Sequence, residues 1–305
     1  MKGQLKGTLI LLLTALIWGC AFVAQSSAAD TLQPFTVQAT RSIIGGMALI
    51  PVILAMRLFN KKKSDKNPPK TNNKMLILGG IVCGVVLCTA TNLQQFGIEY
   101  TTPGKAGFIT ALYILFVPLI GLVFKKRVPW HIWICIAVGL VGLYLLCMDG
   151  SFSLAIGDTY VLVCAIVFAI HIIAVDYFIQ YADGVKLSCI QFFTSGIISL
   201  VLMFAFETPD VSTILDAAIP ILYLGIMSTG VAYTLQVVGQ KYCSPTVASL
   251  AMSFESVFAV LGEFTVFGLI MQKDVSMSAR ELIGCLVMFA AIIISQLPLD
   301  KKIKS

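Results

Sequence analysis

The sequence predicts an all-α polytopic membrane protein, with ten transmembrane helices arranged as two inverted five-helix repeats. Three observations predict this fold: an apolar composition, a series of apolar segments of similar length, and a motif that occurs twice. Hydrophobic residues make up 58% of the chain and charged residues 12%, whereas soluble domains carry about 25% charged residues. In hydrocarbon, only helices and closed barrels satisfy their own backbone hydrogen bonds. We therefore expect a helical bundle in a membrane.

Ten apolar segments have the length of a membrane span. Each is near the ~20 residues that a helix needs to cross about 30 Å of hydrocarbon. The loops between them are short, so no room remains for a soluble catalytic domain. The segments are 7–27, 35–58, 75–98, 104–124, 130–148, 157–178, 188–206, 217–240, 245–270 and 279–297.

The basic residues are distributed unevenly between the two sides of such a bundle. With the N-terminus in the cytoplasm, the ten spans leave only Lys105, Lys273 and Arg280 in outer loops. Cytoplasmic loops of membrane proteins carry an excess of Lys and Arg. We therefore predict a multi-pass protein of the plasma membrane with both termini, loop 59–74 and loop 125–129 in the cytoplasm. A topology-setting loop explains the basic run in 59–74 better than nucleic-acid binding, so no nucleic-acid partner is expected.

The N-terminal segment offers an alternative. Two lysines, an apolar run and a small-residue stretch ending at Ala29 resemble a cleavable signal peptide. The segment has a counterpart later in the chain, and this favours its retention as the first span.

A motif near the middle of each half indicates an internal duplication. Residues 92–103 read NLQQFGIEYTTP and residues 234–245 read TLQVVGQKYCSP, with the frame L-Q-x-x-G-x-x-Y-x-x-P at a constant spacing of 142 residues. Weaker matches pair Gly7 with Gly157 and place Gln38 near Gln191. The predicted halves are residues 1–149 and 150–305. Because each half has an odd number of spans, the second enters the membrane from the opposite side, an arrangement typical of secondary transporters.

Further short motifs mark the spans of both halves. They are Ala15–Gly19 (ALIWG), Gly97 with Tyr100 and Pro103, residues 108–113 (FITALY), Gly157-Asp158, residues 168–171 (FAIH) and residues 254–259 (FESVFA).

With these motifs the whole chain resembles the EamA-type permeases of the drug/metabolite transporter superfamily. The resemblance implies a plasma-membrane carrier of small metabolites or drugs, often an exporter. Two departures weaken the transfer of a substrate from any one member. Ser256 stands where the family's E-P-V-x-A pattern has proline, and 125–127 and 272–274 replace the family's frequent Gly-Glu-Arg.

Glu255 is the first candidate for a functional residue. A carboxylate in the middle of a span costs about 2.5–3.5 kcal/mol on insertion scales, so it is retained where it faces water or a partner. The 142-residue spacing pairs Glu255 with Tyr113, and we expect the two to be symmetry mates near mid-membrane. Together they are suited to binding a cationic or amino group or a proton. The alternative is that Glu255 completes a buried hydrogen-bond network without a ligand.

Five other polar or aromatic residues are candidates by depth and type. His171 titrates near neutral pH in water, and Gln95 and Gln236 offer donors and acceptors. Arg41 needs an acidic partner, for which Glu255, Glu263 or the substrate would serve, and Trp18 either walls the cavity or packs in lipid. Each also has a purely structural interpretation. The substrate- or proton-binding candidates are therefore Glu255, Tyr113, His171, Gln95, Gln236, Arg41 and Trp18.

The predicted function is that of a secondary transporter. It would move a small metabolite or drug-like solute by alternating access, as an exporter, with proton coupling left open. Its partners would be the solute and the lipid bilayer, with a homodimer left open. No paired catalytic groups, phosphate-binding loop or metal-ligand spacing occurs in the sequence, so no enzyme, no ATP drive and no cofactor is expected. The alternative is a non-transporting membrane scaffold or lipid-flipping subunit.

Overall fold

The computed structural model describes residues 2–63, 72–101, 103–148, 155–263 and 278–297. These residues are almost entirely helical, and no strand occurs among them. The elements are α1 (Lys2–Ala29), α2 (Pro34–Lys63), α3 (Asn73–Ile98), α4 (Pro103–Ala111), α5 (Tyr113–Val123), α6 (Trp130–Cys147), α7 (Ile156–Phe178), α8 (Gly184–Phe206), α9 (Val211–Asp216), α10 (Ala218–Leu222), the π-helix η1 (Tyr223–Tyr233), α11 (Thr234–Gln240), α12 (Pro245–Met252), α13 (Glu255–Glu263) and α14 (Ala279–Ser295).

Eight stretches of helix are long and apolar enough to cross a membrane, among the residues that the structure describes. They coincide within a few residues with eight of the segments expected from the sequence, and a shorter apolar helix at Trp130–Leu146 lies at a ninth. The expected span 279–297 corresponds to α14. Large apolar side chains such as Leu9, Phe204 and Leu286 are exposed, as expected for a surface in contact with lipid.

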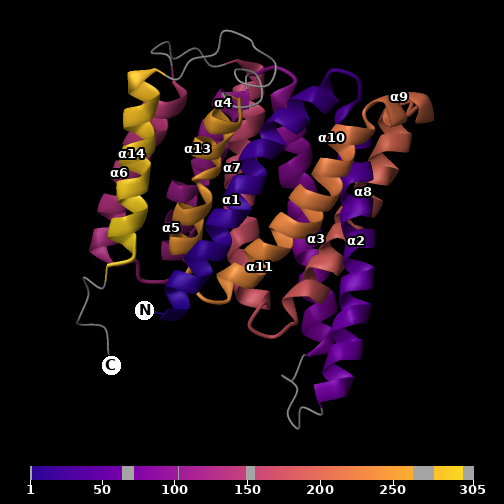
Figure 1. Ribbon diagram of the computed structural model, residues 1–305, viewed down its shortest axis with the longest axis horizontal. Helices are drawn as coiled ribbons and strands as arrows, with labels where there is room; N and C mark the ends of the chain where they lie inside the picture. The colour runs from indigo at the N-terminus through magenta and orange to yellow at the C-terminus, as the bar shows by residue number, and fades with distance from the viewer. Residues whose placement is uncertain (1, 64–71, 102, 149–154, 264–277, 298–305) are drawn as a thin grey trace.

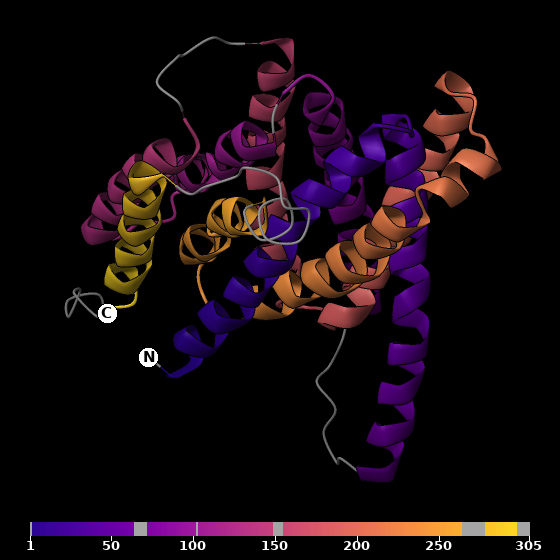
Figure 2. The same cartoon turned by 45° about the horizontal axis from the view of Figure 1, so that its top comes forward.

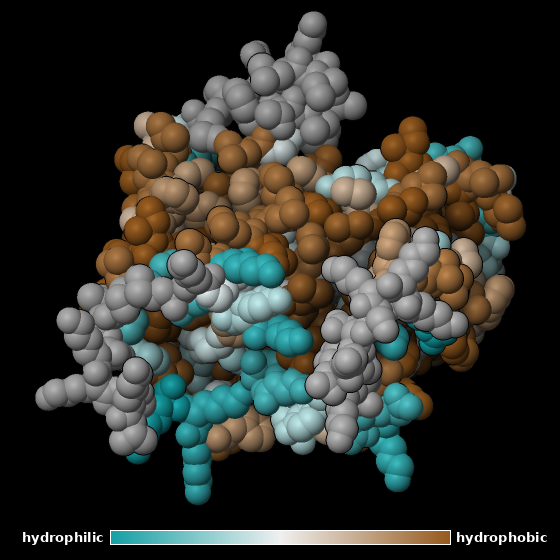
Figure 3. Space-filling model, turned by 60° about the horizontal axis from the view of Figure 1, so that its bottom comes forward, coloured by the Kyte–Doolittle hydropathy of each residue, from teal (hydrophilic) through white to brown (hydrophobic). Residues whose placement is uncertain are grey.

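The helices form a bundle whose two edges are helix pairs. α6 and α14 lie side by side at one edge, α2 and α8 lie at the other, and α1 and α7 run through the middle (Figures 1 and 2). α1 begins and α14 ends at the same end of the bundle, where Thr8 Oγ1 donates a 3.2 Å hydrogen bond to Gln296 Oε1. We call this the terminal end. Hydrophilic side chains gather there, while the flanks are hydrophobic (Figure 3).

The duplicated motif marks two equivalent helix crossings. A Cβ built on Gly7 would lie 2.9 Å from the carbonyl oxygen of Gly239 and 2.9 Å from Tyr242 Cβ. A Cβ on Gly157 would lie 2.7 Å from the carbonyl oxygen of Gly97 and 2.8 Å from the Cβ of the matching tyrosine of that motif. At each crossing, a glycine of one helix (Gly7 or Gly157) faces the glycine of the motif on the other helix (Gly239 or Gly97). These small residues let α1 approach α11 closely, and α7 approach α3.

Three pairs of equivalent residues contact each other directly. Tyr113 and Glu255 form a hydrogen bond across 142 residues of sequence. Cβ atoms built on Gly142 and Gly284 would lie within 3.0 Å of each other's carbonyl oxygens, where α6 crosses α14. Ser42 Oγ and Ser195 Oγ are 3.5 Å apart between α2 and α8. Tyr113 with Glu255 and Gly142 with Gly284 are 142 residues apart, the spacing of the duplicated motif, and Ser42 with Ser195 are 153 apart, the spacing of Gln38 and Gln191.

Two spans are interrupted at equivalent positions. α4 ends at Ala111 and α5 begins at Tyr113, while α12 ends at Met252 and α13 begins at Glu255. The interruption is held across the spans, because Ser256 Oγ donates a 3.0 Å hydrogen bond to the carbonyl oxygen of Gly107. At both interruptions the chain makes a short hydrogen-bonded turn: Leu112 N donates to the carbonyl oxygen of Ile109 at 3.2 Å, and Phe254 N donates to that of Ala251 at 3.4 Å.

The span at residues 218–240 contains a π-helix of 11 residues, η1. Its counterpart in the first half, α3, is described as one continuous α-helix. π-helical turns are rare and frequently occur at functional sites. Here η1 packs against α1 and α2, and its residues contribute to the cavity described next.

Candidate functional site

A small polar cavity lies at the centre of the bundle, between the two interrupted spans. Its volume is about 30 Å³, which is the volume of one or two water molecules. Five of the seven candidates chosen from the sequence line it: Trp18, Arg41, Tyr113, Gln236 and Glu255. Because they come from α1, α2, α5, α11 and α13, both halves of the chain build the cavity.

The pair Tyr113 and Glu255 joins the two interrupted spans. Tyr113 is the first residue of α5 and Glu255 the first of α13. The hydroxyl of Tyr113 donates a 2.9 Å hydrogen bond to Glu255 Oε1, and both side chains are buried, with 3% and 4% exposed. Glu255 therefore has one protein donor and a second oxygen that remains available to a proton, a water or a solute.

Arg41 does not have the acidic partner that its type suggested. It is buried, with Nε donating to Thr229 Oγ1 at 3.1 Å and Nη2 to Ser228 Oγ at 2.7 Å. Both hydroxyls belong to η1. Among the described side chains it forms no ion pair, and the side chain of Glu263, a suggested partner, lies outside them. A guanidinium without a carboxylate thus borders the same cavity as Glu255.

Gln95 lies beside the cavity, in a cluster of three amides. Gln25 Nε2 donates to Gln94 Oε1 at 3.2 Å and to Gln95 Oε1 at 3.3 Å. Gln94 Nε2 in turn donates to Thr110 Oγ1 at 3.1 Å. The cluster ties α1, α3 and α4 together on the side of the cavity away from the terminal end.

Trp18 lines the cavity, whereas His171 lies behind the residues that line it. His171 Nε2 is 3.2 Å from Gln191 Oε1, and its Nδ1 is buried with no hydrogen-bond partner. Its ring meets the ring of Tyr233 edge to face, with centroids 6.2 Å apart. Trp18 packs on the other side of Tyr233 at 4.6 Å, and its Nε1 donates to the carbonyl oxygen of Ser228 at 3.3 Å.

Several lining residues were not among the sequence candidates. They are Gln25, Gln94, Thr110, Ser228 and Tyr233. Gln94 was detectable, since it occupies the position in the duplicated motif that Gln236 occupies in the other half. Neutral hydroxyls and a tyrosine in an apolar span carry no comparable signal, because they are also common in helix packing.

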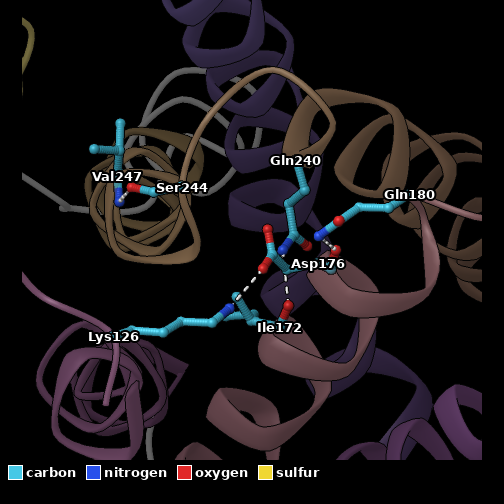
Figure 4. A network of polar contacts seen from close by, with 7 residues as sticks. All are labelled: Lys126, Ile172, Asp176, Gln180, Gln240, Ser244 and Val247. Carbon is cyan, nitrogen blue, oxygen red and sulfur yellow. Dashed lines mark hydrogen bonds and ion pairs between the residues drawn. The ribbon is translucent and has the colours of Figure 1, made fainter. Parts of the chain in front are cut away.

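An ion pair stands on either side of the cavity. At the terminal end, Lys126 Nζ lies 2.9 Å from Asp176 Oδ2, linking the segment after α5 to α7 (Figure 4). At the opposite end, Lys105 Nζ lies 2.5 Å from Asp158 Oδ2, linking α4 to the start of α7. The interrupted span α4–α5 is therefore fastened to α7 above and below the cavity.

Comparison with known proteins identifies the class. The model of the EamA-like transporter family matches residues 5–148 and again residues 155–297. An uncharacterized transporter of Archaeoglobus fulgidus is 27% identical over 96% of this chain and 86% of its own length. One of Clostridium kluyveri is 24% identical over 86% of each chain. A crystal structure with 20% identity has a TM-score of 0.73 over 95% of this chain and 96% of its own.

The apolar helices and the polar cavity thus belong to a multi-pass membrane transporter. In particular, the chain is a member of the EamA-like transporter family, which its two halves match in turn. This confirms the resemblance found in the sequence and points to transport rather than catalysis. Among the described residues, no group of three or more His, Cys, Asp or Glu is placed to hold a metal ion.

Proposed function

We propose that this protein is a secondary transporter that moves a small metabolite or drug-like solute out across the plasma membrane by alternating access. Two inverted five-helix halves, residues 1–149 and 150–305, would supply ten transmembrane helices and exchange conformations around the central cavity. The observation that carries the proposal is the hydrogen bond between Tyr113 and Glu255 inside that cavity. It joins equivalent residues, and each begins the second part of an interrupted span, the geometry in which transporters bind solute.

The proposal assigns the terminal end of the bundle to the cytoplasm. Lys6, Lys126 and Lys241 are all at this end of the described chain, where Lys6 Nζ lies 4.9 Å from the centre of the Tyr242 ring. Basic residues favour the cytoplasmic side. The N-terminus and the C-terminus would then both be cytoplasmic, and Lys105 and Asp158 would lie at the outer end.

The two ion pairs are suited to act as alternating gates. Both ion pairs are formed and the cavity is only about 30 Å³, as a closed intermediate of the proposed cycle would require. Opening towards the cytoplasm would separate Lys126 from Asp176, and opening outwards would separate Lys105 from Asp158. The pair of Lys126 and Asp176 is near the surface, so breaking it costs roughly 0–1 kcal/mol. The Asp158 carboxylate is buried, so separating it from Lys105 costs more unless water or solute replaces the lysine.

Glu255 is proposed to bind either a proton or a cationic group of the solute. A carboxylate held by a single hydroxyl in a closed cavity is tolerated when it is hydrated, paired or protonated. Arg41 supplies a positive charge on the opposite half of the chain for an anionic group. Proton coupling would arise if a proton and the solute compete for Glu255.

The test is transport by the purified protein in liposomes, screened against labelled metabolites with and without a pH gradient. Glu255→Gln keeps the shape of the side chain and removes its charge, and we expect it to abolish the response to the pH gradient and lower the rate by about tenfold or more, or about 1.4 kcal/mol. Glu99→Gln makes the same change outside the cavity and serves as control. If Glu255→Gln reaches the membrane and transports with unchanged rate and pH dependence, Glu255 is structural. If no solute moves but a labelled lipid does, the lipid-flipping alternative replaces the proposal.

A further inference from the structure

Gln236 and Gln240 form a polar step between the central cavity and the terminal end. They are four residues apart on α11, so they lie on the same face of the helix. Gln236 lines the central cavity, and Gln240 lines a pocket of about 400 Å³ at the terminal end, which also contains Asp176 and Gln180. One amide therefore faces each space.

A hydrogen bond of Gln240 connects a residue of the terminal pocket to a residue of the central cavity. Gln240 Nε2 donates a 2.9 Å hydrogen bond to the carbonyl oxygen of Ile172, and the residue Ile172 itself lines the central cavity. Figure 4 shows the Gln240 amide extended towards α7, with Ile172 below it and Asp176 beside it. The Gln240 side chain thus lies next to both spaces.

Both amides retain an unused acceptor. Oε1 of Gln236 and Oε1 of Gln240 are buried and have no hydrogen-bond partner among the described protein atoms, although the two residues are only 1% and 2% exposed. Buried polar atoms are nearly always paired with protein or with ordered water. Two such oxygens, one helical turn apart and between two hollow spaces, provide the partners that buried water needs.

The opposite side of the cavity is built differently. At the spacing of the duplicated motif, Gln236 corresponds to Gln94 and Gln240 to Ile98. Both polar ends of the Gln94 side chain are hydrogen-bonded, its oxygen to Gln25 and its nitrogen to Thr110. Ile98 is buried and apolar. The opposite end thus has one amide with both polar atoms hydrogen-bonded and one apolar side chain. The terminal end has two amides whose oxygen atoms lack a partner.

We propose that Gln236 and Gln240 bind a short chain of water molecules that connects the central cavity to the terminal pocket, even while the gate formed by Lys126 and Asp176 is closed. Protons then reach Glu255 from this side along the water chain, which is too narrow for solute to pass. The proposal rests on the proposed role of Glu255 as a proton site. The groups around Glu255 that also titrate are Tyr113 on α5, Tyr233 on η1 and Cys164 on α7, and the guanidinium nearest the cavity is Arg41 on α2.

The experiment measures how fast Glu255 exchanges its proton for deuterium. Infrared spectra of the reconstituted protein are recorded after a switch from H2O to D2O buffer, and the Glu255 carboxyl signal is isolated by subtracting spectra of Glu255→Gln. Two variants form a matched pair: Gln240→Met keeps the length of the side chain without polar atoms, and Gln240→Glu keeps its acceptor oxygens. Neither the carboxylate of the Glu variant nor the thioether of the Met variant donates a hydrogen bond to the carbonyl oxygen of Ile172, so both variants lose that bond. Gln180→Leu is the control, because Gln180 lines the same terminal pocket but does not line the central cavity.

We expect Gln240→Met to slow exchange at Glu255 by about tenfold or more, equivalent to about 1.4 kcal/mol. Gln240→Glu and Gln180→Leu should exchange at the native rate. The proposal is wrong if Gln240→Met exchanges as fast as the native protein, or if Gln240→Glu is as slow as Gln240→Met. The measurement needs no solute, so it separates this inference from transport: an unchanged transport rate in Glu255→Gln would overturn the proposed role of Glu255 in transport, and the absence of any solute movement would overturn the proposed function, while both would leave the exchange data intact.

Discussion

The hydrogen bond between Tyr113 and Glu255 should make a measurable contribution to stability, because each group has little else to bind. The bond is 2.9 Å long and both side chains are almost fully buried. A hydrogen bond to a charged group contributes about 1.5–3 kcal/mol in soluble proteins, whereas bonds between membrane helices average about 0.6 kcal/mol and reach about 1.7. The cavity holds only one or two waters, so water cannot fully replace the phenol. We therefore expect Tyr113→Phe to lower the free energy of unfolding by about 1–2 kcal/mol.

A double-mutant cycle tests this value directly. Tyr113→Phe, Glu255→Gln and the double variant are unfolded reversibly in mixed micelles, and the coupling energy is the difference from additivity. We expect a coupling of about 1 kcal/mol, limited because glutamine still offers an acceptor oxygen. Loss of packing alone would be additive. A coupling within about 0.3 kcal/mol of zero would refute the reasoning, since two residues in independent contact with their surroundings behave that way.

Two further outcomes are expected. Gly284→Ala should destabilise the protein by about 1–3 kcal/mol in the same assay, because the added methyl would lie 2.7 Å from Leu146 N and 2.8 Å from the carbonyl oxygen of Gly142. Gly139→Ala, on α6, the other helix of this crossing, meets the end of the Ile114 side chain at 3.3 Å and should cost less; equal effects would contradict this account of the crossing. Burial and then the nearby carboxylate of Glu207 raise the pKa of Glu99 at the end of α3. The folded state therefore binds this proton more readily than the unfolded chain, and stability is lost as pH rises through the pKa of Glu99. Glu99→Gln should raise the free energy of unfolding at neutral pH by a few tenths of a kcal/mol, a small effect for such an accessible group, and with it the melting temperature. The gain should disappear on acidification; a gain that persists at low pH would argue against this account.

The spans and the internal pairing could be predicted because both depend on patterns that the sequence displays directly. Apolar segments of spanning length locate helices. The spacing of the duplicated motif alone pairs Tyr113 with Glu255, and the two side chains are hydrogen-bonded in the structure. The motif's glycines also proved to be points of close helix contact. These predictions succeed because helix length and helix contact in a membrane are set by residue type at fixed positions.

The helix interruptions could not be located in the same way. The fourth expected span contains Pro118, the usual cause of a kink, yet the interruption falls at Leu112, and its equivalent falls at Ser253 and Phe254. None of these residues breaks helices by its own propensity. The interruption depends on contacts between the two spans, such as that from Ser256 to Gly107, and a single sequence does not display such contacts.

The hydroxyl partners of Arg41 were not predicted, for a related reason, while Glu263 and the substrate remain untested as its anionic partner. A buried guanidinium suggests a carboxylate, but here it donates to two hydroxyls that η1 presents. A π-helix widens the turn and shifts the side chains that follow it. The hydroxyls of Ser228 and Thr229 therefore reach Arg41 through a backbone feature that has no sequence signature.

The placement of Arg41 bears on how solute binding would be coupled to movement in the proposed function. Arg41 lies on α2 in the first half and Glu255 on α13 in the second, and both border one cavity. A solute that contacts both would bridge the two halves, and it would do so best where they lie closest together. A ligand shifts a conformational equilibrium only by its difference in affinity for the two states, and a two-point contact across the halves supplies that difference. In the proposed function the two charged groups would need no ion pair with each other, because an ion pair between Arg41 and Glu255 would close the cavity without solute and would remove the dependence of the proposed cycle on its cargo.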